Sequence, residues 1–204
     1  TGHALIQVSA SGENNIILYP GANHGNTKEY VDSVISRFDE GDILTLQNEV
    51  NMLDYVVDKA YERGMRIFLN PSPFNDALKS IDKKKISTFV LNEVEGFLMT
   101  GEKEADRILD RLSESFAGAS FVLTLGDKGS IALCGRERIS CECVKSEVRD
   151  TTAAGDTYTG YLIASLARGM DMEAAMKRAS KAASIAVSRN GAIPSIPCAR
   201  EVDG

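Results

Sequence analysis

The residues best suited to chemistry lie in one stretch, residues 150–160, which reads DTTAAGDTYTG. Its small residues, Ala153 to Gly155, leave the backbone uncovered where a helical pattern begins, so several N–H groups lack intrahelical acceptors and can converge on an anion. The carboxylate of Asp156 falls within the first turn of that helix. Gly155 permits close approach of a ligand, and Gly160, one turn further on, leaves space beside the carboxylate.

A carboxylate at this position also has a purely structural explanation. The helix dipole favours acids in a first turn, and on physical grounds alone a capping role and a catalytic role for Asp156 carry equal weight. Phosphoryl transfer would use the whole arrangement, because the helix start would neutralise charge on the phosphate while the carboxylate takes the proton of the attacking hydroxyl. The chain contains no G-x-x-x-x-G-K-S/T pattern, which excludes a Walker-type loop.

Residues 150–160 resemble the C-terminal signature of the ribokinase-like (PfkB) carbohydrate kinases, which is close to D-T-x-A/G-A-G-D-x-F/Y-x-G, and Ala153 is similar to the ribokinase branch. The resemblance implies ATP-dependent phosphorylation of a sugar's primary hydroxyl, with ribose favoured. The alternatives are another sugar or nucleoside kinase of this family and, from a different class, a non-catalytic nucleotide-binding fragment. The resemblance assigns Asp156 as the catalytic base and makes an anion hole of Ala153, Ala154 and Gly155.

Two further segments resemble the nucleotide site of the family. Residues 124–129 are similar to its T-L-G-x-x-G segment, although two glycines at this spacing are also typical of a hairpin turn. Asn92 and Glu95 resemble its N-x-x-E motif, which implies an association with Mg²⁺, and the same pair fits a capping box; both roles can hold together. The nucleotide contacts implied by the resemblance are Asn92, Thr124, Leu125, Gly126, Asp127, Lys128, Gly129, Gly155, Asp156 and Ser180.

Two more segments concern the sugar and a monovalent cation. Glu49 follows a strand predicted at 43–46, at the edge where parallel sheets bind ligands. An acid at a helix N-terminus is the structural alternative, whereas the resemblance implies that Glu49 and Asp156 contact the sugar. Residues 186–195 resemble the ribokinase loop that holds K⁺, although Gly191 and Pro194 would otherwise simply end a helix. The cation ligands implied by the resemblance are Asp150, Thr152, Ala186, Arg189, Gly191 and Ser195.

The composition is ordinary for a soluble globular chain. The 204 residues carry a net charge of −6 with scattered basic residues, which argues against a nucleic-acid partner. No apolar run reaches membrane-spanning length and no leader pattern opens the chain, so we expect a cytoplasmic protein without a membrane partner. The four cysteines form no C-x-x-C pair, and we interpret them as reduced packing residues, with Cys141 and Cys143 on one face of a strand.

Alternating patterns predict the elements that position these residues. Helices are expected at 28–38, 50–63, 102–116 and 172–188, after Asn92 to residue 99 and at 161–168, with strands at 43–46, 66–69, 86–91 and 120–125. Such alternation favours a parallel sheet with crossover helices, and hairpins are predicted at 3–19, around a turn at 11–14, and at 130–144. The resemblance implies a ribokinase-like three-layer α/β/α fold, in which 3–19 is half of a β-sheet lid and 28–204 the nucleotide-binding core of one kinase domain.

The resemblance covers the chain in order but lacks the N-terminal part of the family, with its D-x-N and G-G-K-G-A-N sugar-binding segments. Because the chain opens at Thr1 directly into a strand pattern, we expect a fragment whose sheet exposes an apolar edge. The sequence therefore leaves open the identity of the sugar, the oligomeric state and the activity of this chain alone. The ligands implied are a sugar, ATP, Mg²⁺ and K⁺, with a homodimer formed through the lid.

Overall fold

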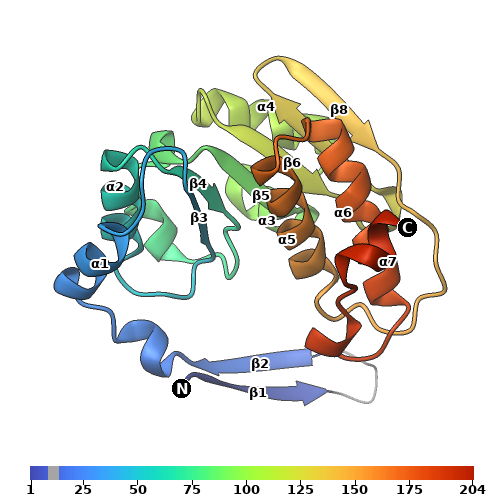
Figure 1. Ribbon diagram of the computed structural model, residues 1–204, viewed down its shortest axis with the longest axis horizontal. Helices are drawn as coiled ribbons and strands as arrows, with labels where there is room; N and C mark the ends of the chain where they lie inside the picture. The colour runs from blue at the N-terminus through green and yellow to red at the C-terminus, as the bar shows by residue number, and fades with distance from the viewer. Residues whose placement is uncertain (9–13) are drawn as a thin grey trace. The chain divides into compact units, whose positions relative to one another are not determined.

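The computed structural model describes residues 1–8 and 14–204, which form two compact units, 1–86 and 87–204. In the first unit, β1 (His3–Val8) pairs antiparallel with β2 (Asn14–Tyr19), in a register from His3 opposite Tyr19 to Val8 opposite Asn14 (Figure 1). This pairing confirms the first predicted hairpin. Its predicted turn lies, except for Asn14, outside the described residues.

The remainder of the first unit alternates helices and strands. Helix α1 (Lys28–Ile35) is followed by β3 (Ile43–Leu46), α2 (Leu53–Glu62) and β4 (Arg66–Leu69), and β3 pairs with β4 in parallel. The two strands begin and end where the pattern predicts. Helix α2 starts three residues later than predicted because Met52, its N-cap, adopts a left-handed backbone with φ 59°. Val57 and Ala60 of this helix are fully buried, and α2 packs against β4.

The second unit contains the longer run of elements. They are β5 (Thr88–Asn92), α3 (Glu93–Thr100), α4 (Ala105–Ser115), β6 (Ser120–Thr124), β7 (Ser130–Cys134), β8 (Glu137–Cys141), α5 (Ala154–Ala167), α6 (Met172–Val187) and α7 (Ala199–Asp203). Strands β5 and β6 are parallel, whereas β7 and β8 continue the sheet as an antiparallel hairpin. The short helix α7 was not predicted.

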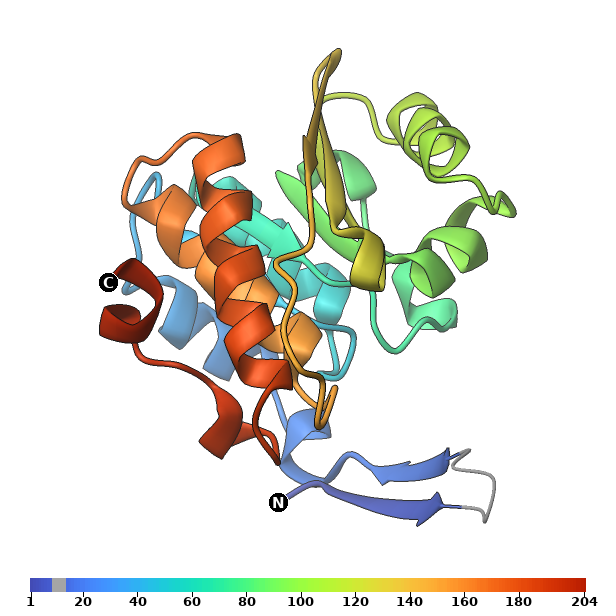
Figure 2. The same cartoon turned by 90° about the vertical axis from the view of Figure 1, so that its right-hand side faces the viewer.

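Helices cover both faces of this β5–β8 sheet, α5 and α6 on one and α3 and α4 on the other (Figures 1 and 2). Strand residues alternate between the two layers, since Val90 packs with the α5–α6 side while Phe89 stacks on Phe121 and Phe116 on the opposite side. The core also includes the fully buried Leu162 of α5. The predicted layered α/β fold is therefore confirmed.

The second hairpin is confirmed but shorter than predicted. Strand β8 ends at Cys141, so Cys143 lies beyond the strand and the predicted shared strand face of the two cysteines is wrong. All four cysteines are free thiols, and burial raises the pKa of the Cys141 thiol.

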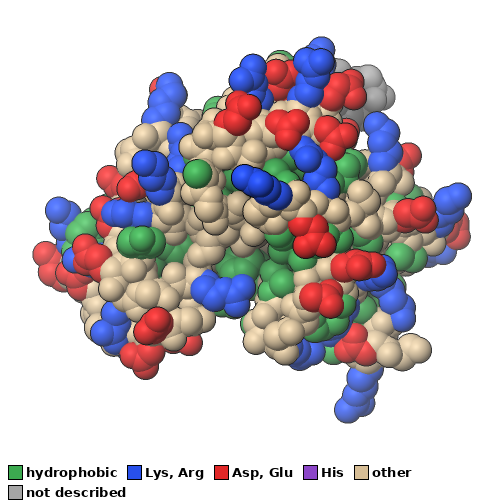
Figure 3. Space-filling model, turned by 90° about the horizontal axis from the view of Figure 1, so that it is seen from above, with side chains coloured by type: hydrophobic (Ala, Val, Ile, Leu, Met, Phe, Trp, Pro, Cys, Tyr) green, Lys and Arg blue, Asp and Glu red, His purple; other side chains and the backbone are tan. Residues whose placement is uncertain are grey.

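The surface matches the scattered charge of the sequence. On the face shown in Figure 3, Lys and Arg alternate with Asp and Glu, and the side chains drawn there form no continuous basic area. Within the described part of the chain, no helix combines the length and the apolar character needed to cross a membrane.

Gly96 makes the packing of α3 on α4 testable. A Cβ at Gly96 would lie 2.8 Å from Ile108 Cγ2 and 3.4 Å from Leu123 Cδ1, whereas one at Gly160, also within a helix, would meet no atom within 4 Å. We expect Gly96→Ala to lower the free energy of unfolding by about 1–3 kcal/mol through overpacking. Gly160→Ala should leave it unchanged or raise it by about 0.4–1 kcal/mol. Urea unfolding measures both, and equal effects of the two variants would contradict the packing argument.

Candidate nucleotide and phosphate site

The start of α5 has the geometry of an anion site. Ala153, its N-cap, adopts a left-handed backbone with φ 59°, and no side chain caps the helix. The Ala154 N–H donates to Thr151 O at 3.2 Å, and the Thr157 N–H donates to Ala153 O at 2.9 Å. The first N–H groups of a helix have no acceptor within it, so a helix start without a side-chain cap can present donors to an anion.

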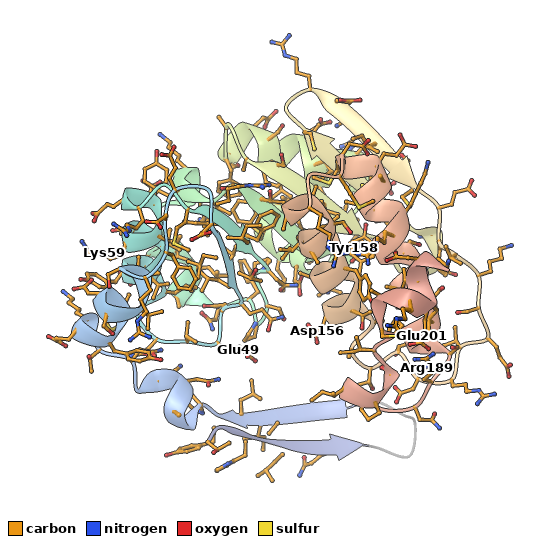
Figure 4. The ribbon with its side chains drawn as sticks, in the orientation of Figure 1. Glu49, Lys59, Asp156, Tyr158, Arg189 and Glu201 are labelled. Carbon is orange, nitrogen blue, oxygen red and sulfur yellow. The ribbon has the colours of Figure 1, made fainter. Side chains whose placement is uncertain are left out.

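Asp156 lies in the first turn of α5 and is exposed, and Figure 4 shows its carboxylate at the end of that helix. A Cβ added at Gly155 or at Gly160 would meet nothing within 4 Å, so the backbone around the carboxylate is open on both sides. The structure thus gives Asp156 the access that a proton acceptor requires.

Asp150 connects this turn to the loop after α6. One carboxylate oxygen accepts the Thr152 N–H at 2.9 Å, and the other accepts the Gly191 N–H at 2.9 Å. Hydrogen bonds from the Thr152 side chain, the Gly191 N–H and the Thr152 N–H hold the pKa of Asp150 below its usual value. Three of the predicted cation ligands therefore meet in one hydrogen-bonded group.

The other predicted cation ligands follow in the same loop. Ala186 lies in the last turn of α6, and its carbonyl accepts the Arg189 N–H at 3.0 Å. Ser195 is fully buried, and its hydroxyl donates to Ala192 O at 2.6 Å. These two bonds fold the loop back on itself. The predicted ligands of this loop are backbone and hydroxyl oxygens, which lie close together in the sequence.

Asn92 and Glu95 form the capping box that the sequence offered as the structural alternative. The Asn92 side chain accepts the Glu95 N–H, and the Glu95 carboxylate accepts the Asn92 N–H, each at 2.9 Å. No three His, Cys, Asp or Glu side chains of the described residues gather into a metal cluster. A role for this pair with Mg²⁺ therefore depends on water and substrate oxygens for the other ligands.

The segment 124–129 forms a tight turn between β6 and β7. Leu125 N donates to Gly129 O at 2.8 Å, and both Gly126 and Gly129 have positive φ, 58° and 94°. A Cβ on Gly129 would lie 2.1 Å from Cys141 O, so only glycine fits there, while Gly126 faces open space. The hairpin alternative from the sequence is therefore also correct, because this turn opens the β7–β8 hairpin.

Strand register brings these segments together. Asn92 pairs with Thr124 across β5 and β6, and Thr124 pairs with Ser130 across β6 and β7. The Ser130 hydroxyl then lies 2.7 Å from the Tyr158 hydroxyl of α5, in a buried contact. The N-x-x-E segment, the glycine turn and the helix of Asp156 are thereby joined through neighbouring residues.

The contact between Ser130 and Tyr158 was missed by the sequence reasoning. Burial raises the pKa of Tyr158, so its phenol stays neutral and one of the two hydroxyls donates to the other. The available signal was weak: a tyrosine two residues after Asp156 and a serine directly after the glycine turn. This buried pair fixes α5 just after the carboxylate.

Ser180 is buried on α6 and faces the segment that follows β8. Its hydroxyl accepts the Val144 N–H at 3.3 Å and donates to Glu142 O at 3.2 Å. Both bonds hold the backbone of residues 142–144. A direct contact of Ser180 with a nucleotide stays a prediction.

Glu49 belongs to the first unit, where it lines a pocket of about 560 Å³ together with His3, His24 and Asn75. Helix α2 begins only at Leu53, so the alternative that Glu49 is a helix N-terminal acid is wrong. The neighbouring Asn48 is buried and donates from its side chain to Pro73 O at 2.7 Å, which holds this loop in place. Glu49 is exposed in the pocket and accessible to a polar ligand.

Comparison with known proteins identifies the chain at the level of a family. The model of the pfkB family carbohydrate kinases matches residues 1–199. The chain belongs to this family. Among curated relatives, the ribokinase of Haemophilus influenzae is 32% identical, over 98% of this chain and 67% of its own length. This PfkB chain therefore spans about two thirds of that relative.

Solved structures agree with this assignment. The ribokinase of Thermotoga maritima has a TM-score of 0.81 and 31% identity, and covers 100% of this chain and 68% of its own. The ribokinase of Arabidopsis thaliana, complexed with ribose and ATP, has a TM-score of 0.83 and 26% identity, and covers 99% and 68%. The predicted resemblance, the ribokinase-like α/β fold and membership of a carbohydrate kinase family are thus confirmed.

The capping box separates two roles of the Asn92–Glu95 pair. Asn92→Ala removes the cap and should lower the free energy of unfolding by about 1 kcal/mol. Glu95→Gln keeps an oxygen that can accept the Asn92 N–H, so its effect on stability should be smaller. If the Glu95 charge also serves Mg²⁺, this variant should weaken Mg²⁺-dependent nucleotide binding, as measured by calorimetry. Asp171→Ala, which removes the cap of α6, is the matched control; equal binding losses in all three variants would leave only a structural role.

Proposed function

We propose that this PfkB-family chain is the greater part of an ATP-dependent sugar kinase that phosphorylates a primary hydroxyl, with ribose as the preferred sugar. The observation that carries the proposal is the start of α5, which no side chain caps and which holds the exposed carboxylate of Asp156 in its first turn. The ribokinases among its relatives, one of them complexed with ribose and ATP, support the choice of substrates.

In this proposal the chemistry is divided between a base and an anion hole. The Asp156 carboxylate accepts the proton of the sugar hydroxyl as its oxygen attacks the terminal phosphorus of ATP. The N–H groups of Ala153 and Gly155, at the positive end of the helix dipole, stabilise the negative charge on the transferred group. The left-handed backbone of Ala153 directs the chain into this turn and so helps to form the anion hole.

The nucleotide is assigned to the segments joined by strand register. The glycine turn at 124–129 and Asn92 lie beside each other at the carboxyl ends of β5 and β6, where parallel strands bind ligands. Mg²⁺, when bound, would neutralise phosphate charge, and Asn92 and Glu95 fit it because one carboxylate with water and phosphate oxygens suffices. Ser180 fixes residues 142–144, which we assign to the wall of the nucleotide site.

Within the first unit, Glu49 is assigned to contacts with sugar hydroxyls. A carboxylate accepts hydrogen bonds from two sugar hydroxyls, and the pocket of Glu49 also offers the amide of Asn75 and the imidazole of His24. Polar groups of this kind in one cavity are typical of sites for polyhydroxylated ligands.

A monovalent cation fits the group formed by Asp150 and the loop that follows α6. The lowered pKa of Asp150 favours its ionised carboxylate, and the proposed ligand atoms in the loop from Ala186 to Ser195 are all oxygens, the donor type suited to a hard cation. Bound there, K⁺ would act on the shape of the turn that begins at Asp150, without touching substrate.

Asp156→Asn tests the proposed base. In the natural gene product we expect kcat with ribose to fall by about 10²- to 10⁴-fold while ATP affinity changes little, because only proton acceptance is lost. Asp54→Asn is a matched control, since Asp54 also lies in a first helical turn after a left-handed N-cap. A coupled ADP-release assay with ribose, deoxyribose, fructose and a nucleoside measures turnover. ATP binding without turnover of any acceptor would favour the non-catalytic alternative. An unchanged kcat in Asp156→Asn would show that the Asp156 carboxylate is not the base.

Cation exchange tests the proposed K⁺ site. At fixed ionic strength, we expect activity and the thermal unfolding midpoint to be higher in K⁺ than in Na⁺ or choline, because only a large hard cation matches the oxygen set. Asp150→Asn keeps an acceptor for one N–H but removes the charge, so the difference between the salts should shrink. Identical values in all salts would contradict the site.

A further inference from the structure

Two ion pairs attach the short helix α7 to its unit, one to helix α6 and the other to the loop that follows α6. Arg178 of α6 binds Asp203 through two hydrogen bonds, of 2.7 and 3.0 Å, and also donates to Ser165 of α5 at 3.1 Å. This first pair therefore attaches α7 to the helical layer.

The second ion pair joins α7 to the loop after α6. Glu201 pairs with Arg189, and Figure 4 shows the two side chains next to each other. The other carboxylate oxygen of Glu201 accepts the Cys198 N–H at 2.8 Å, which caps α7, so the carboxylate cannot turn away without losing that bond. The Glu201 carboxylate, fixed by this bond, therefore holds the Arg189 guanidinium in place.

From Arg189, a series of hydrogen bonds leads to the phosphate turn. Two residues further on, the Gly191 N–H donates to Asp150, and the same carboxylate accepts the Thr152 N–H at the start of the turn before α5. The Arg149 N–H, which donates to Val187 O at 2.8 Å, fixes the other side of this junction. One route from Glu201 to the turn at 151–155 therefore passes through Arg189, Gly191 and Asp150.

We propose that the Arg189–Glu201 ion pair is a latch that positions Gly191 against Asp150 and thereby sets the shape of the phosphate-binding turn. Glu201 is then a positioning residue that touches neither substrate nor cation. The function of the latch rests on the proposed phosphate and cation sites, but the mechanical link itself does not. A substitution at Glu201 removes none of the proposed cation ligands, so it can affect the cation only through the position of the loop.

Two substitutions of a carboxylate by its amide, both on α7, distinguish the latch from a simple attachment of this helix. Glu201→Gln removes the charge facing Arg189 and retains an oxygen for the Cys198 N–H, whereas Asp203→Asn removes the charge facing Arg178. Amide hydrogen exchange of the unliganded chain should show about three- to fivefold faster exchange of the Gly191 and Thr152 N–H groups in Glu201→Gln, the ratio expected from losing a partly exposed ion pair. In Asp203→Asn these two amides should keep their wild-type rates. Glu201→Asp, which restores the charge, should recover part of the protection.

The functional readout is made on the same variants. In Glu201→Gln, the K⁺ concentration for half-maximal thermal stabilisation and the KM for ATP should each rise about three- to fivefold, while kcat should change less. Asp203→Asn should change neither the K⁺ concentration nor the KM. Unchanged exchange at Gly191 in Glu201→Gln, or equal acceleration in both variants, would overturn the latch. Faster exchange without any response of the wild type to K⁺ would uphold the latch and reject the proposed cation site instead.

Discussion

The register of β5, β6 and β7 is the constraint on which the candidate site depends. It sets Asn92 beside Thr124 and Thr124 beside Ser130, and from Ser130 a buried hydrogen bond of 2.7 Å reaches Tyr158 on α5. A slip of one residue would turn every side chain to the opposite face, exchanging the Phe89 layer for the Val90 layer. The apolar packing on both faces of the sheet therefore maintains the alignment of the polar groups at its edge.

The glycine turn between β6 and β7 transmits this alignment. Gly129 has no room for a Cβ because Cys141 O occupies that space, so the turn and strand β8 are in direct backbone contact. Gly126 has open space and keeps only its positive φ as a requirement. The two glycines look equivalent in the sequence and both have positive φ, but of the pair Gly129 alone is also required by packing.

The sequence predicted the elements well where pattern and punctuation agree. Strands β3 and β4 were located to the residue, and the end of α3 followed from Gly101, which adopts a left-handed backbone. It failed where a local conformation overrode the pattern, as at Met52, which delays α2. The start of α5 was recognisable because Ala153, Gly155 and Asp156 are neighbours in sequence, so local rules apply to them.

Contacts between distant residues could not be predicted in the same way. Ser130 and Tyr158 are 28 residues apart, and Glu201 meets Arg189 only because α7 folds back, a helix of five residues with too little periodicity to detect. Asp150 was named as a cation ligand, but its hydrogen bonds to Thr152 and Gly191 follow from tertiary structure alone. The family resemblance grouped Asp150, Thr152 and Gly191 as ligands of one cation, and the structure shows the hydrogen bonds that join them.

The neutrality of the Tyr158–Ser130 pair has a consequence for how the protein responds to its surroundings. A serine hydroxyl does not ionise, and burial moves the phenol further from ionisation, so neither group that anchors α5 gains or loses a proton near neutral pH. An anchor built from an ion pair would weaken with salt, whereas this one depends on neither ionic strength nor acidity. The attachment of the helix that carries Asp156 therefore does not change when carboxylates or imidazoles nearby gain or lose protons.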